Sequence, residues 1–375
     1  INEKKIHIIL ILDLLKKIFS LIILVLLFPI YLSFLLYLKK KKLTLISINT
    51  WQIGALIQQL DSIIKNNKNK KFFLICPDYL IEFKSFPEIY RKKNLKYSKS
   101  SILYFFVYPL LVFKEFSTDA YEFEVLNKNS KFNKVHAQKN YNYNYKNLFK
   151  KLNFNINSNQ SRLVTIHIKD EFFIKGSSTR ISNYKSYMKT IRWLIKNNYK
   201  VVRFVHPKSI RDIFKHKNYH ELTTLNESEK IRQFYLIKKS KLFICTQSGP
   251  ASYNFVLNTT FLQVNSYPIN VSFVTKSKDY LIYKSIKKNG KYVSLKDMIK
   301  KNLHLYFNPL KKEHHGYILK NNSSQEIYEA TRDVLSKNKS YYFSNYLKGL
   351  NIEIPARYTL SKIPKKFYEK ISKIN

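Results

Sequence analysis

Residues 241–265 read KLFICTQSGPASYNFVLNTTFLQVN, and this stretch decides the fold class. KLFICT (241–246) and TTFLQVN (259–265) are short runs rich in β-branched and aromatic residues, which predict two strands. Residues 250–257 between them predict a short helix with proline in its first turn. A strand, a helix and a second strand in this order form a βαβ unit, which has parallel strands.

The same alternation extends in both directions from this stretch. Upstream it predicts strands at RLVTIHI (162–168) and KVVRFV (200–205), and helices at 183–197 and 227–239; downstream it predicts a helix at 323–337. Nearer the N-terminus it predicts a strand at 43–48, a helix over QIGALIQQLDSIIKN (52–66) and a strand at 71–77. We therefore expect an α/β fold with two Rossmann-like domains. Ligands of such sheets bind at the carboxyl ends of the strands.

The N-terminal region contains a long apolar run, IFSLIILVLLFPIYLSFLLYL (18–38), without a charged residue. A helix of this length spans a hydrocarbon core of about 30 Å. Lysines at 39–42 indicate that the residues after 38 stay in the cytoplasm. We expect residues 1–42 to be a membrane-anchoring helix, with a kink or a re-entrant hairpin at Pro29 as open topologies. A buried core helix is the alternative.

The remaining boundaries follow from composition. A polar stretch at 125–160, rich in Asn, Lys and Tyr, predicts a linker. We expect an N-terminal α/β domain at 43–155, a C-terminal α/β domain at 156–340 and a basic tail at 341–375. The two cysteines, Cys76 and Cys245, each end an apolar run and are expected to be buried thiols.

The net charge is +43, from 67 Lys and Arg against 24 Asp and Glu. Such a charge is typical of proteins that bind nucleic acid. However, the lysines are scattered, and the abundance of Lys, Asn, Ile, Tyr and Phe is the bias of an AT-rich genome. We therefore expect no nucleic-acid partner, and expect the charge to favour anionic lipid headgroups and nucleotide phosphates.

Two groups of residues are candidates for chemistry. The first is TIHIKDE (165–171) with Arg180, at the end of a strand. His167 and Lys169 alternate with apolar residues and so point to one face. A cation there could neutralise a pyrophosphate, and a histidine or a carboxylate (Asp170 or Glu171) could act as a base. Ordinary solvated charges at a strand end are the alternative.

The second group is TQSGP (246–250), between a strand and a helix. Thr246, Ser248 and Gly249 in such a turn expose backbone N–H groups, which together with the helix dipole form an anion site. A simple capped turn is the alternative. Arg203 lies on a predicted central strand, where its charge needs a donor phosphate or a structural partner such as Asp170.

Several familiar sites are missing from the sequence. It has no G-x-G-x-x-G, no P-loop, no D-x-D of the kind that holds a metal-bound sugar nucleotide, and no Cys/His cluster with zinc spacing. We expect neither a metal nor another cofactor.

Taken in order, these segments resemble a family of bacterial glycosyltransferases from surface-polysaccharide clusters, which is distantly similar to the α1,6- and O-fucosyltransferases. The resemblance runs through VTIHIKDE, Arg180 with Asn183 and Tyr184, YMKTIRWLIKNNYKVVRFVHP, LIKKSKLFICTQSGPASYNFVLNTTFLQVN and NNSSQEIYEATRDVL. INTWQIGALIQQLD resembles the family's first strand and helix. The similarity covers most of residues 43–337.

The resemblance implies a GT-B-like fold and an inverting, metal-independent transfer from a nucleotide sugar to a glycan or lipid-linked acceptor. It makes 43–155 the acceptor-side domain and 156–340 the nucleotide-sugar-binding domain, and it implies that the membrane is a bacterial inner membrane. It places His167 and Lys169 beside the donor diphosphate, Arg180 within reach of it, and Ser248 and Gly249 against the nucleotide. The sequence departs from the family at 55, where Ala replaces His, at Lys169, where Arg is usual, at 205–206, where Val-His replaces Gly-Asp, and at Pro250.

Two questions stay open at this stage. The base could be Asp170, Glu171 or an acid of the first domain such as Asp78. The departures also leave a second reading, a non-catalytic membrane scaffold of a polysaccharide assembly complex.

Overall fold

The computed structural model describes most of the chain. The described residues are 3–48, 50, 52–66, 69–90, 94–113, 118–119, 143, 145–149, 162–170, 179–209, 211, 213–269, 272–305, 307, 312–352 and 360–374. Their contacts divide into two units, one containing residues up to Leu148 and one continuing from Phe149 to the C-terminus. The expected boundary at 155 lies outside the described residues, as does most of the polar stretch at 125–160.

Unit 1 is built on a parallel sheet in the order β3-β2-β1-β4. Its strands are β1 (Leu43–Ser47), β2 (Lys71–Ile75), β3 (Leu95–Ser98) and β4 (Thr118–Asp119). Its helices are α1 (Glu3–Leu26), α2 (Phe28–Lys40), α3 (Ile53–Asn66) and α4 (Ser101–Val112), with 3₁₀ turns η1 (Asp78–Leu80) and η2 (Phe86–Ile89) and the short α6 (Tyr145–Phe149) at the unit boundary. The predicted strand–helix–strand order of β1, α3 and β2 is confirmed.

The N-terminal apolar run forms two helices that meet at a break just before Pro29, where the sequence left a kink or a re-entrant hairpin open. Among the described residues no single helix is long and apolar enough to cross a bilayer, whereas the pair formed by Ile11–Leu26 and α2 passes that test together, bent by 89°. The break precedes Pro29, which stands in the first turn of α2 and cannot donate a helical hydrogen bond. The buried-helix alternative holds in part, because Tyr31 and Leu38 of α2 lie in the core of unit 1.

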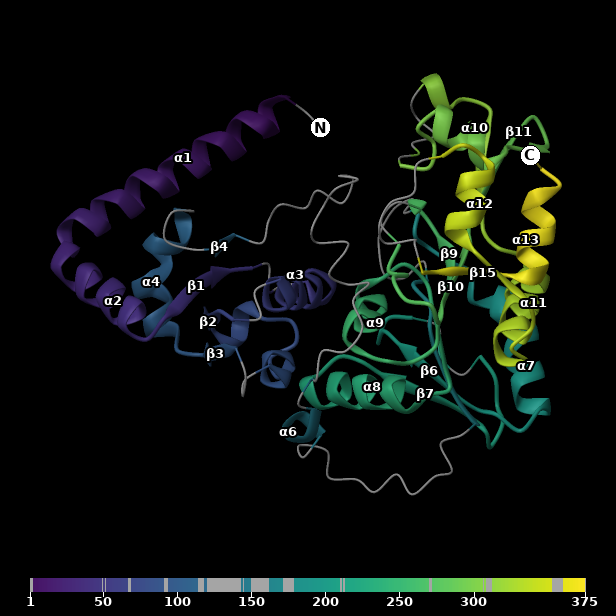
Figure 1. Ribbon diagram of the computed structural model, residues 1–375, viewed down its shortest axis with the longest axis horizontal. Helices are drawn as coiled ribbons and strands as arrows, with labels where there is room; N and C mark the ends of the chain where they lie inside the picture. Colours follow the sequence, from purple (N-terminus) through teal and green to yellow (C-terminus); the bar gives the residue numbers. More distant parts are fainter. Residues whose placement is uncertain are drawn as a thin grey trace. The chain divides into compact units, whose positions relative to one another are not determined.

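Unit 2 is built on an eight-stranded sheet in the order β14-β15-β10-β9-β8-β5-β6-β7, parallel except for β14 (Figure 1). These strands are β5 (Leu163–His167), β6 (Lys200–Val205), β7 (Tyr219–Thr223), β8 (Leu242–Cys245), β9 (Phe261–Ser266), β10 (Asp279–Tyr283), β14 (Ser340–Tyr342) and β15 (Lys362–Pro364). A small antiparallel sheet holds β11 (Ser285–Lys288), β12 (Lys291–Tyr292) and β13 (Tyr317–Lys320). The expectation of two α/β halves with parallel sheets is thus confirmed.

Helices cover both faces of the large sheet. Figure 1 shows α8 (Glu227–Lys239) and α9 (Tyr253–Val256) on one side, and α7 (Met188–Lys196), α11 (Ser324–Leu335) and α13 (Lys365–Ser372) on the other. The remaining helices are η6 (Tyr184–Tyr187), η7 (Gly249–Ser252), α10 (Leu295–Lys300), η9 (Lys312–His314) and α12 (Phe343–Gly349). The predicted helix at 323–337 is confirmed as α11, and Ser323 and Glu326 form a capping box at its start.

The last residues of the chain are part of unit 2, and the expectation of a separate basic tail at 341–375 is wrong. β15 pairs with β10 in the large sheet, and Phe343, Phe367 and Ile371 are buried. The lysines of this segment masked an amphipathic pattern, in which the apolar side chains of α13 face the sheet while its lysines face outward.

Candidate functional site at the carboxyl edge of the unit 2 sheet

Three neighbouring parallel strands bring the predicted residues to one edge. The ladder pairs His167 of β5 with Cys245 of β8 and with Phe204 of β6. Residues that follow these positions, at 168–170, 206–209 and 246–249, therefore leave the sheet together. His167, Lys169, Asp170, Thr246, Ser248 and Gly249 all belong to this edge.

Thr246 ties two of these strand ends together. Its backbone N–H donates to the carbonyl of His167 at 3.1 Å, and its hydroxyl oxygen accepts from the backbone N–H of Lys169 at 2.9 Å. Its side chain is fully buried. Thr246 therefore fixes where Lys169 leaves the sheet, and its expected contact with the donor stays a prediction.

His167 and Ser248 form a side-chain contact between the ends of β5 and β8. The imidazole Nδ1 lies 3.1 Å from the Ser248 hydroxyl, and the Cys245 thiol lies 3.5 Å from the same hydroxyl. Burial of the ring, which is 2% exposed, lowers the pKa of His167 to about 3, and the charges of Arg203 and Lys169 act in the same direction. His167 is therefore neutral at physiological pH and lies against Ser248, and its expected place beside the donor diphosphate stays a prediction.

The turn after β8 is shorter than expected. Ser248 precedes η7, a four-residue 3₁₀ turn, and α9 adds only four residues. Two single turns carry little helix dipole, so the predicted dipole contribution to an anion site is small. What the turn offers a ligand is the backbone of partly exposed Gly249 next to the Ser248 hydroxyl.

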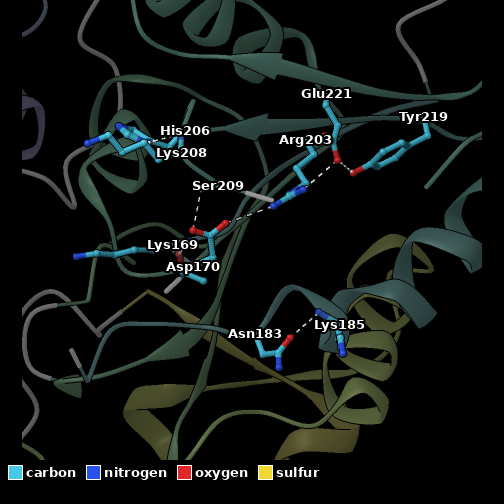
Figure 2. A network of polar contacts seen from close by, with 11 residues as sticks. Lys169, Asp170, Asn183, Lys185, Arg203, His206, Lys208, Ser209, Tyr219 and Glu221 are labelled. Atoms are coloured by element: carbon cyan, nitrogen blue, oxygen red, sulfur yellow. Dashed lines mark hydrogen bonds and ion pairs between the residues drawn. The ribbon is translucent and has the colours of Figure 1, made fainter. Parts of the chain in front are cut away.

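Asp170 and Arg203 belong to a buried polar network (Figure 2). The Arg203 guanidinium lies 3.5 Å from Asp170 and 2.9 Å from Glu221. The Ser209 hydroxyl donates to Asp170 at 2.9 Å, and the Tyr219 hydroxyl donates to Glu221 at 2.6 Å. Arg203 is 1% exposed and faces two carboxylates, which is the structural ion-pair alternative rather than a donor contact.

This network also removes Asp170 from the candidate bases. One carboxylate oxygen faces Ser209 and the other faces Arg203, and the residue is buried. Glu171, the second predicted catalytic residue, lies outside the described residues. Asp78 belongs to unit 1, at the carboxyl end of β2, where its carboxylate pairs with Lys99 at 3.1 Å.

The positive charges of the site lie on the other side of Asp170. Figure 2 shows Lys169 extending away from Asp170, opposite Arg203. Partial burial, together with the nearby charge of Arg180, lowers the pKa of Lys169 to about 8. Arg180 itself is exposed. Lys169 and Arg180 are thus close enough to repel each other, and a bound anion would relieve this repulsion.

Lys284 is a residue of this region that the sequence did not indicate. It follows β10, is 3% exposed, and donates from Nζ to the carbonyl of Ile181 at 2.8 Å. Desolvation lowers its pKa to about 7, and no carboxylate of the described residues pairs with it. The Ser182 N–H in turn donates to the carbonyl of Lys169 at 2.8 Å, so Lys284 and Lys169 hold the same short segment. In the sequence, the only sign of this residue is a single lysine in the short run YLIYKS.

Comparisons with known proteins give only distant similarities. No family model and no curated protein matches the chain. Among solved structures, ADP-heptose lipopolysaccharide heptosyltransferase II from E. coli is similar at 12% identity, over 79% of this chain and 99% of that chain, with a TM-score of 0.45.

Two further structures show similarity at the same level. A family 9 glycosyl transferase from Veillonella parvula has 10% identity over 79% of this chain and 96% of that chain, with a TM-score of 0.46. The iron-containing dodecameric glycosyltransferase TibC from enterotoxigenic E. coli has 12% identity, 73% and 70% coverage, and a TM-score of 0.40. With TM-scores this low, none of these similarities assigns a donor or an acceptor to this chain.

Proposed function

We propose that the protein is a GT-B-like glycosyltransferase that moves a sugar of hexosyl or fucosyl type from a nucleotide-sugar donor to a cell-surface polysaccharide or a lipid-linked acceptor. The observation that carries the proposal is the meeting of two adjacent strand ends at the carboxyl edge of unit 2. One end supplies the Lys169 cation, and the other supplies the Ser248 hydroxyl held by neutral His167. A cation beside an oriented hydroxyl suits the diphosphate of a nucleotide sugar.

The chemistry follows from the charges. When the glycosidic bond to the donor breaks, negative charge develops on the departing nucleoside diphosphate. Fixed cations stabilise this charge without having to reorganise, and in our proposal Lys169 and Arg180 do so in place of a metal. Ser248 and Gly249 contact the diphosphate or the ribose, while inversion at the sugar needs a base, which we place on Glu171 or Asp78.

We also propose that residues 1–42 attach the protein to the cytoplasmic face of a bacterial inner membrane. Apolar side chains of α1 and α2, such as Phe19, Leu26 and Phe28, are exposed on the unit. The lysines at 39–42 follow directly and suit an anionic cytoplasmic leaflet. A lipid-linked acceptor would then meet the enzyme at the membrane.

Calorimetry on the detergent-solubilised full chain tests the proposed function. Titration with UDP, GDP, CMP, dTDP and ADP sugars in the presence of EDTA should identify one nucleotide class that binds. Lys169→Ala should weaken that binding about ten- to a hundredfold, the value of a charge-assisted contact. Lys185→Ala, which removes an exposed lysine from the start of η6, is the matched control and should bind as the wild type does. Absence of binding by any sugar nucleotide would refute the proposal.

A non-catalytic scaffold is the second candidate function. It is favoured by one observation: the carboxylate nearest the site, Asp170, is held in an ion pair with Arg203. Cells carrying Lys169→Ala together with Arg180→Ala separate the two functions. Loss of the surface glycan at unchanged protein level supports the transferase, and an unchanged glycan supports the scaffold.

A further inference from the structure

A pocket of about 470 Å³ opens at the amino-terminal edge of the unit 1 sheet, opposite the edge at which parallel sheets hold their substrates. It is lined by Tyr37, Lys41, Leu43, Lys71, Asn94, Leu95 and Lys96. Three of these seven residues are lysines, and none is acidic. The strand register explains the clustering, because β1 and β2 pair Leu43 with Lys71 at their first residues.

One cation of the pocket is held in place by its neighbours. Lys96 Nζ donates to the Tyr37 hydroxyl at 3.0 Å. The same ammonium lies 5.5 Å from the centre of the Tyr37 ring and 5.1 Å from that of Phe73. Lys96 is thus partly ordered before a ligand arrives, while Lys41 and Lys71 are exposed beside it. The volume and the charge suit one phosphate-bearing headgroup.

The pocket adjoins the apolar surface of the unit. Tyr37 lies on α2, and the outward side chains of that helix include Phe28 and Ile30. α4 adds Ile102, which is 84% exposed, and Phe105, which is 66% exposed. α4 packs on the same core as α1 and α2. A ligand with a phosphate and long acyl chains would match both the pocket and this surface.

Packing indicates that the apolar surface lies along the membrane rather than across it. On its inward side α2 is anchored in the unit, since Tyr31 stacks on Phe106 at 4.8 Å and donates to the Phe106 carbonyl at 2.7 Å. α1 carries the ion pair of Asp13 and Lys17 at 2.8 Å with both side chains about half exposed. A charge pair at this place suits the headgroup region and opposes burial in hydrocarbon.

From these observations we infer that α1, α2 and α4 dip into one leaflet, and that the pocket beside α2 binds the phosphate of an anionic phospholipid in that leaflet. This inference rests on the membrane attachment proposed above. It adds a lipid site on the edge of unit 1 remote from its strand carboxyl ends. The apolar helices would supply attachment to any bilayer, and the three lysines would supply the preference for an anionic one.

Vesicle flotation of the full chain tests the inference. The variant Lys41→Gln, Lys71→Gln, Lys96→Gln is compared with a control that removes three exposed lysines of unit 2, Lys296→Gln, Lys348→Gln, Lys373→Gln. On phosphatidylcholine vesicles containing phosphatidylglycerol, the pocket variant should lose about a hundredfold in partitioning, or about fivefold for each lysine. The control should lose less than about twofold per lysine, because its lysines lie outside the pocket.

Further vesicle measurements distinguish the ways in which the inference could be wrong. On pure phosphatidylcholine all three proteins should bind equally, and loss of binding there by the wild type would overturn membrane attachment itself. Equal losses by the pocket variant and the control on anionic vesicles would overturn the pocket in favour of diffuse charge. Release from anionic vesicles by millimolar inorganic phosphate at constant ionic strength would make it a site for free phosphate. Sugar-nucleotide binding by the same preparations reports on folding and on the proposed function, independently of the vesicle measurements.

Discussion

Replacing Lys284 by methionine should stabilise unit 2, and the gain should disappear at alkaline pH. Methionine keeps an unbranched apolar stem and removes an ammonium that is buried beside Ile181 without a carboxylate partner among the described residues. Most buried lysines are destabilising for this reason, because the charged form loses its hydration. A lysine kept in such a place is a sign of function.

The magnitude follows from the pKa. Folding lowers the pKa of Lys284 from 10.5 to about 7, so between these values the unfolded chain holds the proton and the folded chain does not. The stability of the wild type therefore rises with pH across this window, and at pH 7 the cost of the lysine is about 4 kcal/mol. Loss of the hydrogen bond to the Ile181 carbonyl offsets about 1 kcal/mol. We expect Lys284→Met to be about 3 kcal/mol more stable at neutral pH.

Urea unfolding followed by tryptophan fluorescence measures this difference. The chain has two tryptophans, and Trp51→Phe in every protein leaves Trp193 of α7 as the reporter of unit 2. Lys296→Met, which removes an exposed lysine of α10, is the matched control and should change stability by less than about 0.5 kcal/mol. Groups other than Lys284 titrate alike in all proteins, so the difference between variant and wild type isolates this lysine.

Two results would refute the reasoning. If Lys284→Met and the wild type unfold at the same urea concentration at neutral pH, the ammonium is not desolvated in the folded state. If the variant is more stable by the same amount at neutral pH and near pH 10, the gain comes from packing and not from charge.

Three further predictions concern the carboxyl edge of unit 2. Because Lys169 has a pKa of about 8, the donor affinity of the wild type should fall as the pH rises through that value, whereas the affinity of Lys169→Arg should stay constant. Calorimetry across this pH range measures both affinities. An equal fall in affinity in the two proteins would contradict the prediction. Arg203→Met leaves Asp170 and Glu221 buried without their cation and should cost unit 2 about 3–5 kcal/mol in urea unfolding; a loss under about 1 kcal/mol would mean that water enters the network. His167 should show no titration of its ring nitrogens by NMR between about pH 5 and 8, and a midpoint in that range would place its imidazole in solvent.

Local patterns predicted most secondary structure of unit 2. The strand KVVRFV and the helix of residues 227–239 lie where the sequence places them, because a β-branched run and a capped, charged helix are local signals. The apolar segment SILYFFVYPLLV carried no such signal, since it is apolar on all sides and contains Pro109; it forms α4 because it packs on α1 and the sheet.

The site was predictable in its location and less so in its roles. The βαβ pattern predicts that the strand ends meet at one edge, whereas the contact of His167 with Ser248 depends on β5 and β8 being neighbours although β6 and β7 lie between them in the sequence. The neutral state of His167 depends on burial, and the pairing of Arg203 with Glu221 depends on strand register. Both are properties of the assembled sheet, which no short stretch of sequence contains.

The burial of Tyr31 and Leu38 of α2 determines how the chain can be shortened. Deleting residues 1–42 would remove Tyr31 and Leu38 from the core that they share with Leu45, Phe73, Ile75, Val107 and Leu110. Burying two large side chains stabilises the core by about 3–6 kcal/mol, which is a large part of what a small domain has. Helix α2 and the domain on which it packs are therefore one folding unit, and we expect a chain without residues 1–42 to aggregate.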